Sequence, residues 1–200
     1  MVRVGLTVER LVDAAATLAD EAGFDAVTPT ALASIFDVKV ASLYSHVANA
    51  NDLKVRVALL ALDRLADRLA EAIAGRSGQD ALVALANVHR DFAKQHPGLF
   101  AAARHPLDAD AAARSGGVRI AALTRSALRG YRLDREAEVH AIRLLGSVML
   151  GFTTLELAGS FDHSQPPPDA SWLAVLESLH SMLCRLTPYG AASFPAEDLR

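Results

Sequence analysis

The segment formed by residues 28–53, TPTALASIFDVKVASLYSHVANANDL, constrains the fold of this chain more than any other. Thr28 is a good helix N-cap, and Pro29 suits the first helical position, where a missing backbone N–H costs no hydrogen bond. The apolar spacing that follows predicts a short helix with Leu32 and Ile35 on its inward side. The segment therefore opens with a well-defined helix start.

A turn and a second helix complete the segment. Asp37 interrupts the helical pattern, and aspartate tolerates left-handed backbone better than most residues other than glycine. Residues 40–47 predict a second helix whose Leu43 and Val47 face inward. Its other faces carry small, hydroxyl or hydrogen-bonding side chains, namely Ala41, Ser42, Tyr44, Ser45 and His46. Two helices across a tight turn, with such an outer face, predict a helix-turn-helix that enters a DNA groove.

The sequence Leu-Tyr-Ser-His-Val at residues 43–47, followed by a polar break and Asp52-Leu53 opening a long helix, resembles the amino-terminal domain of TetR-family transcriptional regulators. The resemblance covers residues 6–62. Family members commonly have glycine in the turn and lysine just before the long helix, whereas this chain has Asp37 and Ala50. The aspartate keeps the turn available, but the missing lysine removes a phosphate contact and weakens the expected DNA binding.

The resemblance also implies which residues contact DNA. By that resemblance Tyr44 and His46 contact phosphates, whereas packing and helix capping are their alternative roles. Lys39 and Ser42 would begin the recognition helix, and Thr28 would cap toward the DNA backbone. The small apolar side chains of the set suit thymine methyl groups. The expected DNA-binding residues are Thr28, Lys39, Val40, Ala41, Ser42, Tyr44, Ser45, His46 and Lys54.

The charge of the N-terminal region opposes tight DNA binding. Residues 1–56 hold five basic and seven acidic residues, a net charge of −2, whereas DNA-binding domains are usually basic. Lys39 and Lys54 flank the recognition helix, so the local field there is more favourable than the net charge. We expect modest non-specific affinity and dependence on a dimer that joins two half-site contacts. Sequence specificity would come from DNA shape as much as from direct base contacts.

The rest of the chain predicts helices, because no period-2 stretch of β-branched residues is long enough to make a sheet. The fold class is therefore all-α. An N-terminal three-helix helix-turn-helix domain at residues 1–52 is joined by a long helix to a C-terminal helical ligand-binding and dimerisation domain at residues 53–188, with a tail at residues 189–200. Helices are expected at residues 51–74, 80–95, 108–128, 134–158 and 169–186. Thr7, Asp108 and Asp134 are expected N-caps.

Residues 141–186 resemble a TetR-family C-terminal domain type that is marked by Trp-His-Gly in its penultimate helix. Gly151 keeps the last residue of that triplet, and the sequence TLELAG at residues 154–159 fits the type. The resemblance implies a homodimer in which the last two helices of each subunit form a four-helix interface. Apolar residues on more than one face of both helices agree with this. The expected interface residues are Leu144, Val148, Leu155, Leu173, Leu176 and Leu183.

The family also implies a small-molecule pocket between the DNA-binding and dimerisation regions. Such pockets are mostly apolar with a few orienting polar groups. The candidates are Phe92, Phe100, Arg104, His105, Arg119, Met149 and Phe152, although each taken alone is more commonly a core, loop or solvent-exposed residue. An apolar or weakly anionic effector is favoured because the central region has no acidic cluster. It would act by preferring one spacing of the two recognition helices.

The sequence gives little support to an enzyme, a metal or a cofactor. Glu177 and His180 have the Glu-x-x-His spacing of di-iron bundles, but no second copy exists. His89 and His96 lack a third metal ligand, and no phosphate loop or nucleophile elbow appears. Cys184 is expected to be a packed thiol. No apolar run approaches the roughly 18 residues of a membrane helix, so a cytoplasmic protein is expected.

Two functional hypotheses follow. The first is a dimeric repressor that a small-molecule effector releases from double-stranded operator DNA. The second is a helical small-molecule-binding protein of the same fold whose DNA-binding ability is degenerate. An enzyme based on Glu177 or His180 is a distant third. Binding to the DNA upstream of the protein's own gene distinguishes the first two.

Overall fold

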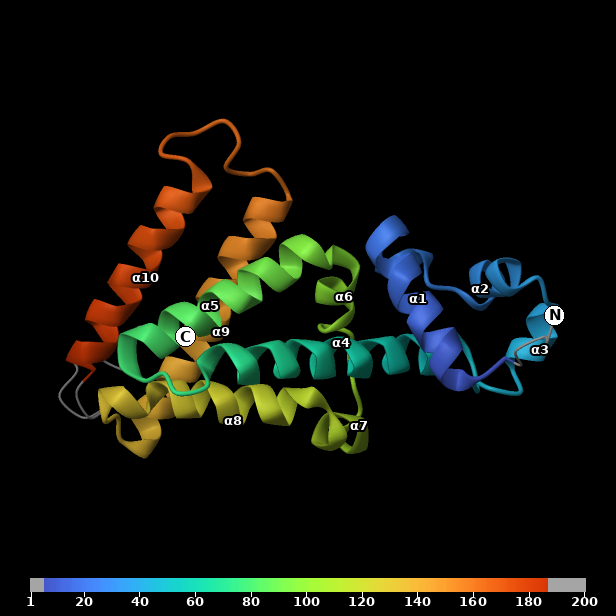
Figure 1. Ribbon diagram of the computed structural model, residues 1–200, viewed down its shortest axis with the longest axis horizontal. Coiled ribbons are helices and arrows are strands. Elements are labelled where there is room, and N and C mark those ends of the chain that lie inside the picture. The colour runs from blue at the N-terminus through green and yellow to red at the C-terminus, as the bar shows by residue number, and fades with distance from the viewer. Residues whose placement is uncertain (1–5, 187–200) are drawn as a thin grey trace, which may run out of the picture. The chain divides into compact units, whose positions relative to one another are not determined.

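The computed structural model describes residues 6–186, and within them the chain forms helices without any strand, which confirms the all-α fold (Figure 1). The helices are α1 (Val8–Ala22), η1 (Phe24–Ala26), α2 (Pro29–Phe36), α3 (Val40–Leu43), α4 (Ala50–Ile73), α5 (Gly78–Gln95), α6 (Pro97–Ala102), α7 (Ala109–Arg114), α8 (Gly116–Leu128), η2 (Arg129–Tyr131), α9 (Arg135–Leu157) and α10 (Pro168–Arg185).

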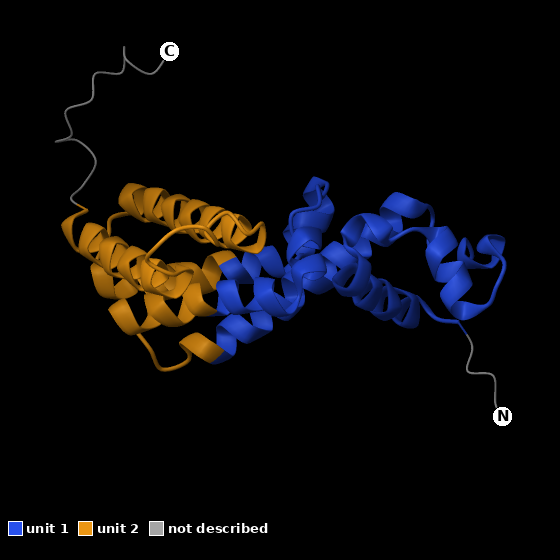
Figure 2. Ribbon diagram, turned by 90° about the horizontal axis from the view of Figure 1, so that it is seen from above, with its two compact units in different colours: residues 1–71, 88–120 blue, residues 72–87, 121–200 orange. Residues whose placement is uncertain are grey.

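The chain divides into two compact units (Figure 2). Unit 1 comprises residues 1–71 and 88–120, and unit 2 comprises residues 72–87 and 121–200. Helices α1 to α3 and α6 and α7 lie in unit 1, whereas α9 and α10 lie in unit 2. The predicted domain boundary between residues 52 and 53 stays a prediction, and the predicted tail lies outside the described residues.

The predicted helix starts are confirmed at four positions. The Thr7 hydroxyl accepts from the backbone N–H of Arg10, and the Thr28 hydroxyl accepts from that of Ala31, at 3.1 Å. Asp108 and Asp134 cap α7 and α9 in the same way. Each such cap stabilises a helix by about 1 kcal/mol relative to alanine. Local sequence therefore determines where these helices begin.

Unit 1 packs α6 tightly against α1. Ala15 and Ala19 of α1 are buried, and Gly98 of α6 lies against the backbone of Ala19. A methyl group in place of the Gly98 hydrogen would collide with the Ala19 carbonyl group. Small residues on both helices thus permit a backbone-to-backbone approach.

A polar network also stabilises the contact between α1 and α6. The Asp20 carboxylate accepts from the backbone N–H of Leu99 at 2.9 Å and lies 2.8 Å from Nδ1 of His96. Nε2 of His96 lies 2.9 Å from the Arg68 guanidinium. Because arginine only donates hydrogen bonds, Nε2 accepts and Nδ1 carries the proton that is donated to Asp20. Residues from α1, α4, α6 and the preceding loop are held together in this way.

The single helix predicted at residues 108–128 is wrong, because the chain breaks into α7 and α8 at Ser115. Ser115 is extended (φ −78°, ψ 159°), and its hydroxyl accepts from the backbone N–H of Gly117 at 3.2 Å. A Cβ on Gly116 would lie 2.5 Å from the backbone of Leu62. Gly116 therefore permits a close approach of α8 to α4 rather than a continuous helix.

The second helix of the helix-turn-helix is shorter than predicted. Helix α3 ends at Leu43, and residues 44–46 form a turn in which the N–H of His46 donates to the Leu43 carbonyl at 2.8 Å. The inward position of Ile35 is also wrong, since 54% of this residue is exposed. Leu32 and Ala33 supply the buried side of α2, with Phe36 on the next turn beneath Arg10.

Unit 2 has an aromatic core between α9 and α10. The Phe152 ring lies 4.9 Å from that of Trp172 and 5.0 Å from that of Phe161. The Trp172 indole donates to the Asn87 side-chain oxygen of α5 at 2.8 Å. Cys184, predicted to be packed, is exposed instead, because the buried stripe of α10 runs through its neighbour Leu183.

Candidate nucleic-acid interface

The turn between α2 and α3 has the predicted geometry. Asp37 ends α2 in the left-handed conformation (φ 51°, ψ 51°), and its backbone N–H lies 3.3 Å from the Ser34 carbonyl oxygen. The N–H of Val38 donates to the Ala33 carbonyl at 3.0 Å. Aspartate thus occupies the position where the family commonly has glycine, and the turn is kept.

Two buried side chains anchor α3 and the turn after it. Leu43 is 1% exposed and Val47 is 3% exposed, which confirms their predicted inward positions. Among the predicted DNA-binding residues the structure exposes Thr28, Lys39, Ala41, Ser42, Tyr44 and Ser45, and half-buries Val40, His46 and Lys54. Residues 39–46 therefore present a mostly polar surface over an apolar anchor, as a groove-binding helix requires.

The two predicted lysines differ in their contacts. Within residues 6–186, Lys39 makes no ion pair and is exposed. Lys54 lies 3.5 Å from the Asp25 carboxylate and 5.1 Å from the centre of the Phe24 ring. Because exposed ion pairs contribute only about 0–1 kcal/mol, a phosphate can replace Asp25 at low cost. A phosphate could pair with Lys39 without breaking an existing ion pair, whereas pairing with Lys54 would first break its contact with Asp25.

Several acidic residues of the N-terminal region lie beside basic side chains. The pairs are Asp13 with Arg64, Asp20 with His96, Asp25 with Lys54 and Asp52 with Arg56. Arg64 lies beyond residue 56, so its charge is missing from a count over residues 1–56. The net charge of −2 therefore overstates the repulsion that a DNA phosphate would meet.

The start of α4 is fixed by reciprocal hydrogen bonds. The Asn49 side chain accepts from the backbone N–H of Asp52 at 2.9 Å, and the Asp52 carboxylate accepts from that of Ala48 at 2.8 Å. Asp52 also holds Arg56 at 3.0 Å. This arrangement resembles a capping box and fixes the polar break that follows Val47.

Unit 2 carries a second exposed face, on α9 and α10. Of the predicted interface residues, Leu155 and Leu173 are exposed by 48% and 61%, while Leu144 and Val148 are half-buried. Leu176 and Leu183 are wrong as interface residues, because they are 3% and 1% exposed within this chain. They belong to the inward stripe of α10 together with Trp172 and Leu179. The outward apolar residues are instead Val139, Leu150, Leu157 and Met182 besides Leu155 and Leu173.

The predicted ligand-pocket residues fall into both units. Phe92, Phe100, Arg104, His105 and Arg119 belong to unit 1, and Met149 and Phe152 belong to unit 2. Phe92 is fully buried, and Arg104 lies over the Phe100 ring at 4.4 Å. His105 contacts the Asn51 side chain at 3.1 Å, and Arg119 pairs with Asp67 at 2.6 Å. Neither unit alone brings the whole set together, so the pocket stays a prediction.

Sequence reasoning missed one buried polar group in unit 2. Thr153 of α9 is 1% exposed, and its hydroxyl has no hydrogen-bond partner among residues 6–186. An unmade buried hydrogen bond costs about 1–3 kcal/mol, so this hydroxyl is a candidate ligand contact. Met149 and Phe152 adjoin it on the same helix. The inward period of α9 could have identified Thr153 from the sequence, but its missing partner could not be seen there.

The features considered for enzyme or metal chemistry do not converge. His180 contacts the Tyr131 hydroxyl at 2.9 Å, and burial together with the nearby Cys184 raises the pKa of Tyr131 to about 12. Glu177 is exposed. Among residues 6–186 no group of three His, Cys, Asp or Glu side chains is placed to hold a metal ion. No helix of this part of the chain is long and apolar enough to cross a membrane.

Comparison with known proteins identifies the family. Residues 82–179 match the model of the tetracyclin repressor-like C-terminal domain. The chain is 33% identical over 165 residues to the uncharacterized HTH-type transcriptional regulator YobS of Bacillus subtilis, covering 82% of this chain and 85% of YobS. The chain belongs to the TetR family of transcriptional regulators. Such regulators are not enzymes.

A second relative and two solved structures agree with membership of the TetR family. The regulator Rv0681 of Mycobacterium tuberculosis is 32% identical over 190 residues, which cover 94% of this chain and 86% of Rv0681. BioQ with its double-stranded DNA operator superposes with a TM-score of 0.65 at 22% identity, covering 91% of this chain and all of BioQ. Streptomyces coelicolor ActR in complex with (S)-DNPA gives 0.62 at 21% identity, with coverages of 89% and 96%. These two structures show the shared fold.

Proposed function

We propose that this TetR-family regulator is a cytoplasmic homodimeric repressor that binds double-stranded operator DNA through α3 and leaves it when a small molecule binds. The observation that carries the proposal is the exposed polar surface of residues 39–46 above buried Leu43 and Val47. BioQ, which shares the fold, has been solved with its operator, and ActR has been solved with a ligand. These structures support both the DNA partner and the effector.

The contacts proposed for DNA follow from the exposed groups. Lys39 offers an unpaired ammonium to a phosphate, and the Tyr44 hydroxyl and the His46 ring offer further hydrogen bonds. Ser42 is exposed and faces a base edge or phosphate. Ser45 contributes less, because its hydroxyl already donates to the Ser42 carbonyl at 2.8 Å and only its lone pairs remain.

For the effector we propose a mostly apolar molecule with one hydrogen-bonding group that reaches the Thr153 hydroxyl in unit 2. The unmade hydrogen bond of Thr153 and the apolar Met149 and Phe152 on the same helix support such a molecule. The effector lowers DNA affinity only by the difference between its affinities for the free and the DNA-competent states.

A fluorescence-anisotropy titration against the protein's own upstream DNA tests the repressor. At about 100 mM salt the wild type binds this DNA more tightly than random duplex, and the Lys39→Ala variant loses about tenfold and has a shallower salt slope. Tyr44→Phe loses less, since only one hydroxyl is removed. Lys94→Ala, at an exposed position of α5, is the control for the loss of a lysine charge and changes little. Equal affinity of the wild type for both duplexes rejects the repressor.

Adjacent threonines test the effector site. In a metabolite panel measured by thermal shift, Thr153→Val weakens the response to the effector, because the hydroxyl that meets the ligand is gone. Thr154→Val is the control, since Thr154 is the exposed neighbour on the same helix. Equal responses of the two variants would place the ligand elsewhere.

A second candidate function keeps the effector and omits operator binding. The acidic N-terminal region and Ala50 in place of the family's lysine favour it. A protein that binds a metabolite but not its upstream DNA in the titration above would be a helical small-molecule-binding protein with degenerate DNA-binding ability.

A further inference from the structure

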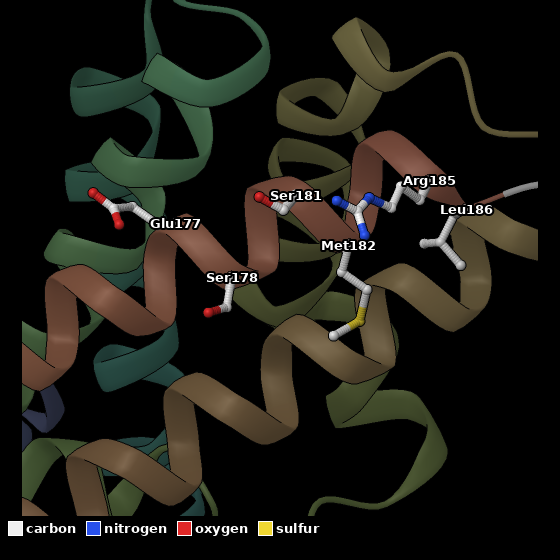
Figure 3. A pocket seen from close by; sticks show the side chains of 6 residues that line it. All are labelled: Glu177, Ser178, Ser181, Met182, Arg185 and Leu186. Carbon is white, nitrogen blue, oxygen red and sulfur yellow. The ribbon is translucent and has the colours of Figure 1, made fainter.

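The outward side of α10 forms a shallow pocket with opposite charges at its two ends. The pocket has a volume of about 640 Å³ and is lined by Glu177, Ser178, Ser181, Met182, Arg185 and Leu186. Figure 3 shows Glu177 at one end, Arg185 at the other and Ser181 between them. Glu177, Ser181 and Arg185 follow one another at intervals of four residues and therefore lie on one face of the helix.

The two charged side chains do not satisfy each other. They are eight residues apart, which places their Cα atoms about 12 Å apart along the helix. Within residues 6–186 neither Glu177 nor Arg185 forms an ion pair with any other side chain. The pocket thus offers a carboxylate and a guanidinium to whatever covers it, each at the same distance from Ser181.

A reversed copy of the same helix fits this arrangement. We propose that two copies of this chain pack α10 against α10 in antiparallel orientation about a two-fold axis beside Ser181, so that Glu177 of each copy pairs with the partner's Arg185. A two-fold interface is self-complementary, so each ion pair occurs twice. The inference rests on the proposed homodimer and adds its register.

The charges exclude the simplest alternative registers. A parallel pairing would place Glu177 beside its own counterpart and Arg185 beside its own, and like charges in contact disfavour such a complex. A shift of one helical turn would move Glu177 away from the partner's Arg185. An unrelated acidic or basic helix would satisfy only one end of the pocket. Only a partner with both charges in reversed order satisfies both ends.

Small residues make the approach possible. Ser178 and Ser181, which line the pocket, are the small residues nearest the proposed crossing. Helices with small residues at the crossing approach to about 8 Å between axes. Each charged residue lies about 6 Å along the helix from the crossing point, so a long arginine side chain spans the gap that a moderate crossing angle opens.

Apolar side chains at the pocket provide most of the affinity of the proposed dimer, and the ion pairs determine its register. Met182, which is 45% exposed, and Leu186, which is half-buried, both line the pocket and lose contact with water when a second helix covers this face. Burial of apolar area drives the association, whereas complementary charges set register and exclude wrong partners.

Charge reversal tests the pairing in solution. Glu177→Arg alone places two arginines together at both ends and weakens the dimer by about tenfold or more in sedimentation equilibrium. Arg185→Glu alone does the same with two glutamates. The doubly reversed chain, E177R with R185E, regains the wild-type dimer constant because each pair is restored with opposite sign. Glu71→Arg, at an exposed position of α4, is the control and leaves the constant unchanged.

Cross-linking tests the position of the axis without relying on affinity. In a Cys184→Ser background, Ser181→Cys forms a disulfide-linked dimer under mild oxidation, because residues beside a two-fold axis meet their own counterparts within disulfide range. Ala122→Cys, at an exposed position of α8, is the control and stays unlinked. Circular dichroism confirms that all variants are folded.

The outcomes separate the register from the function. A wild-type dimer whose doubly reversed variant stays weak, and whose Ser181→Cys variant does not cross-link, overturns the register and leaves the dimeric repressor standing. A wild type that is monomeric at every concentration overturns both. Recovery in the doubly reversed chain together with the Ser181 cross-link supports the proposal.

Discussion

The surface around α3 in unit 1 exposes mostly polar side chains, whereas the outer side of α10 in unit 2 exposes large apolar side chains beside its charged ones. Leu43 of α3 is buried, whereas Lys39 and Tyr44 on either side of this helix are exposed to solvent. On α10, Leu173 and Met182 stand in solvent although the helix also has a buried stripe. Exposed apolar side chains gain from a dry partner, whereas polar ones gain from a hydrated, charged one. The same chain therefore offers one face suited to DNA and one suited to protein.

The largest expected effect comes from a substitution that disturbs the packing of unit 1, because the α3 surface depends on the folding of that unit. Gly98→Ala is expected to lower the free energy of unfolding by about 3 kcal/mol or more, because the new methyl group collides with the Ala19 backbone. Gly146→Ala on α9 has open space and is expected to stabilise the helix by up to about 1 kcal/mol. Urea unfolding measures both. Equal effects would contradict the tight α1–α6 junction.

The second largest loss of stability is expected from the polar network between α1 and α6. Asp20→Ala is expected to cost about 2 kcal/mol, because the Leu99 N–H and His96 lose their acceptor in a partly buried site. Asp13→Ala removes only an exposed pair with Arg64 and costs less than about 1 kcal/mol. Urea unfolding of the two variants should rank them in this order, and the reverse ranking would refute the role of the network.

The stability of unit 1 is expected to depend on pH through His89. Burial lowers the pKa of His89 to about 4 from the usual 6.5. Between these values the unfolded chain binds a proton that the folded chain does not, so stability falls as pH drops from 6.5 to 4. The loss is about 1–2 kcal/mol, because the ring keeps some contact with solvent. His89→Gln should flatten this slope in urea unfolding, whereas His163→Gln, at an exposed position, should not.

The smallest effect concerns the α3 surface alone. Asp25→Asn frees Lys54 and removes a negative charge, so operator affinity should rise severalfold in an anisotropy titration. Asp63→Asn, at an exposed position of α4, is the matched control for the change in net charge. A fall in affinity would show that Asp25 positions Lys54 for DNA rather than competing with it.

Local chemistry made much of unit 1 predictable. Thr28, Pro29 and Asp37 specify where α2 begins and ends, because capping and left-handed backbone depend on residue type. Leu43 and Val47 were identified as buried by their spacing. These features depend on a few neighbouring residues, so one sequence is enough to find them. Ile35 was placed inward because spacing alone does not distinguish it from the true inward set of α2.

Contacts between distant segments could not be predicted in the same way. Asp20 and His96 are 76 residues apart in sequence, and the residues next to either one do not predict that the two side chains form a hydrogen bond. The break at Ser115 depends on the approach of Gly116 to Leu62. Leu176 is as apolar as Leu173, and only the packing of α10 determines which of the two faces inward. Within the expected DNA-binding region the buried Leu43 and Val47 could be predicted from their spacing, whereas the ion pair between Lys54 and Asp25 could not.

Binding to one and to two half-sites tests the central claim most directly. A dimer that holds two weak DNA-binding units should bind a duplex with both half-sites of its operator about 100-fold more tightly than a duplex with one, because the second contact becomes intramolecular. Anisotropy at equal salt measures both affinities. Equal affinity for the two duplexes would contradict the dimeric repressor.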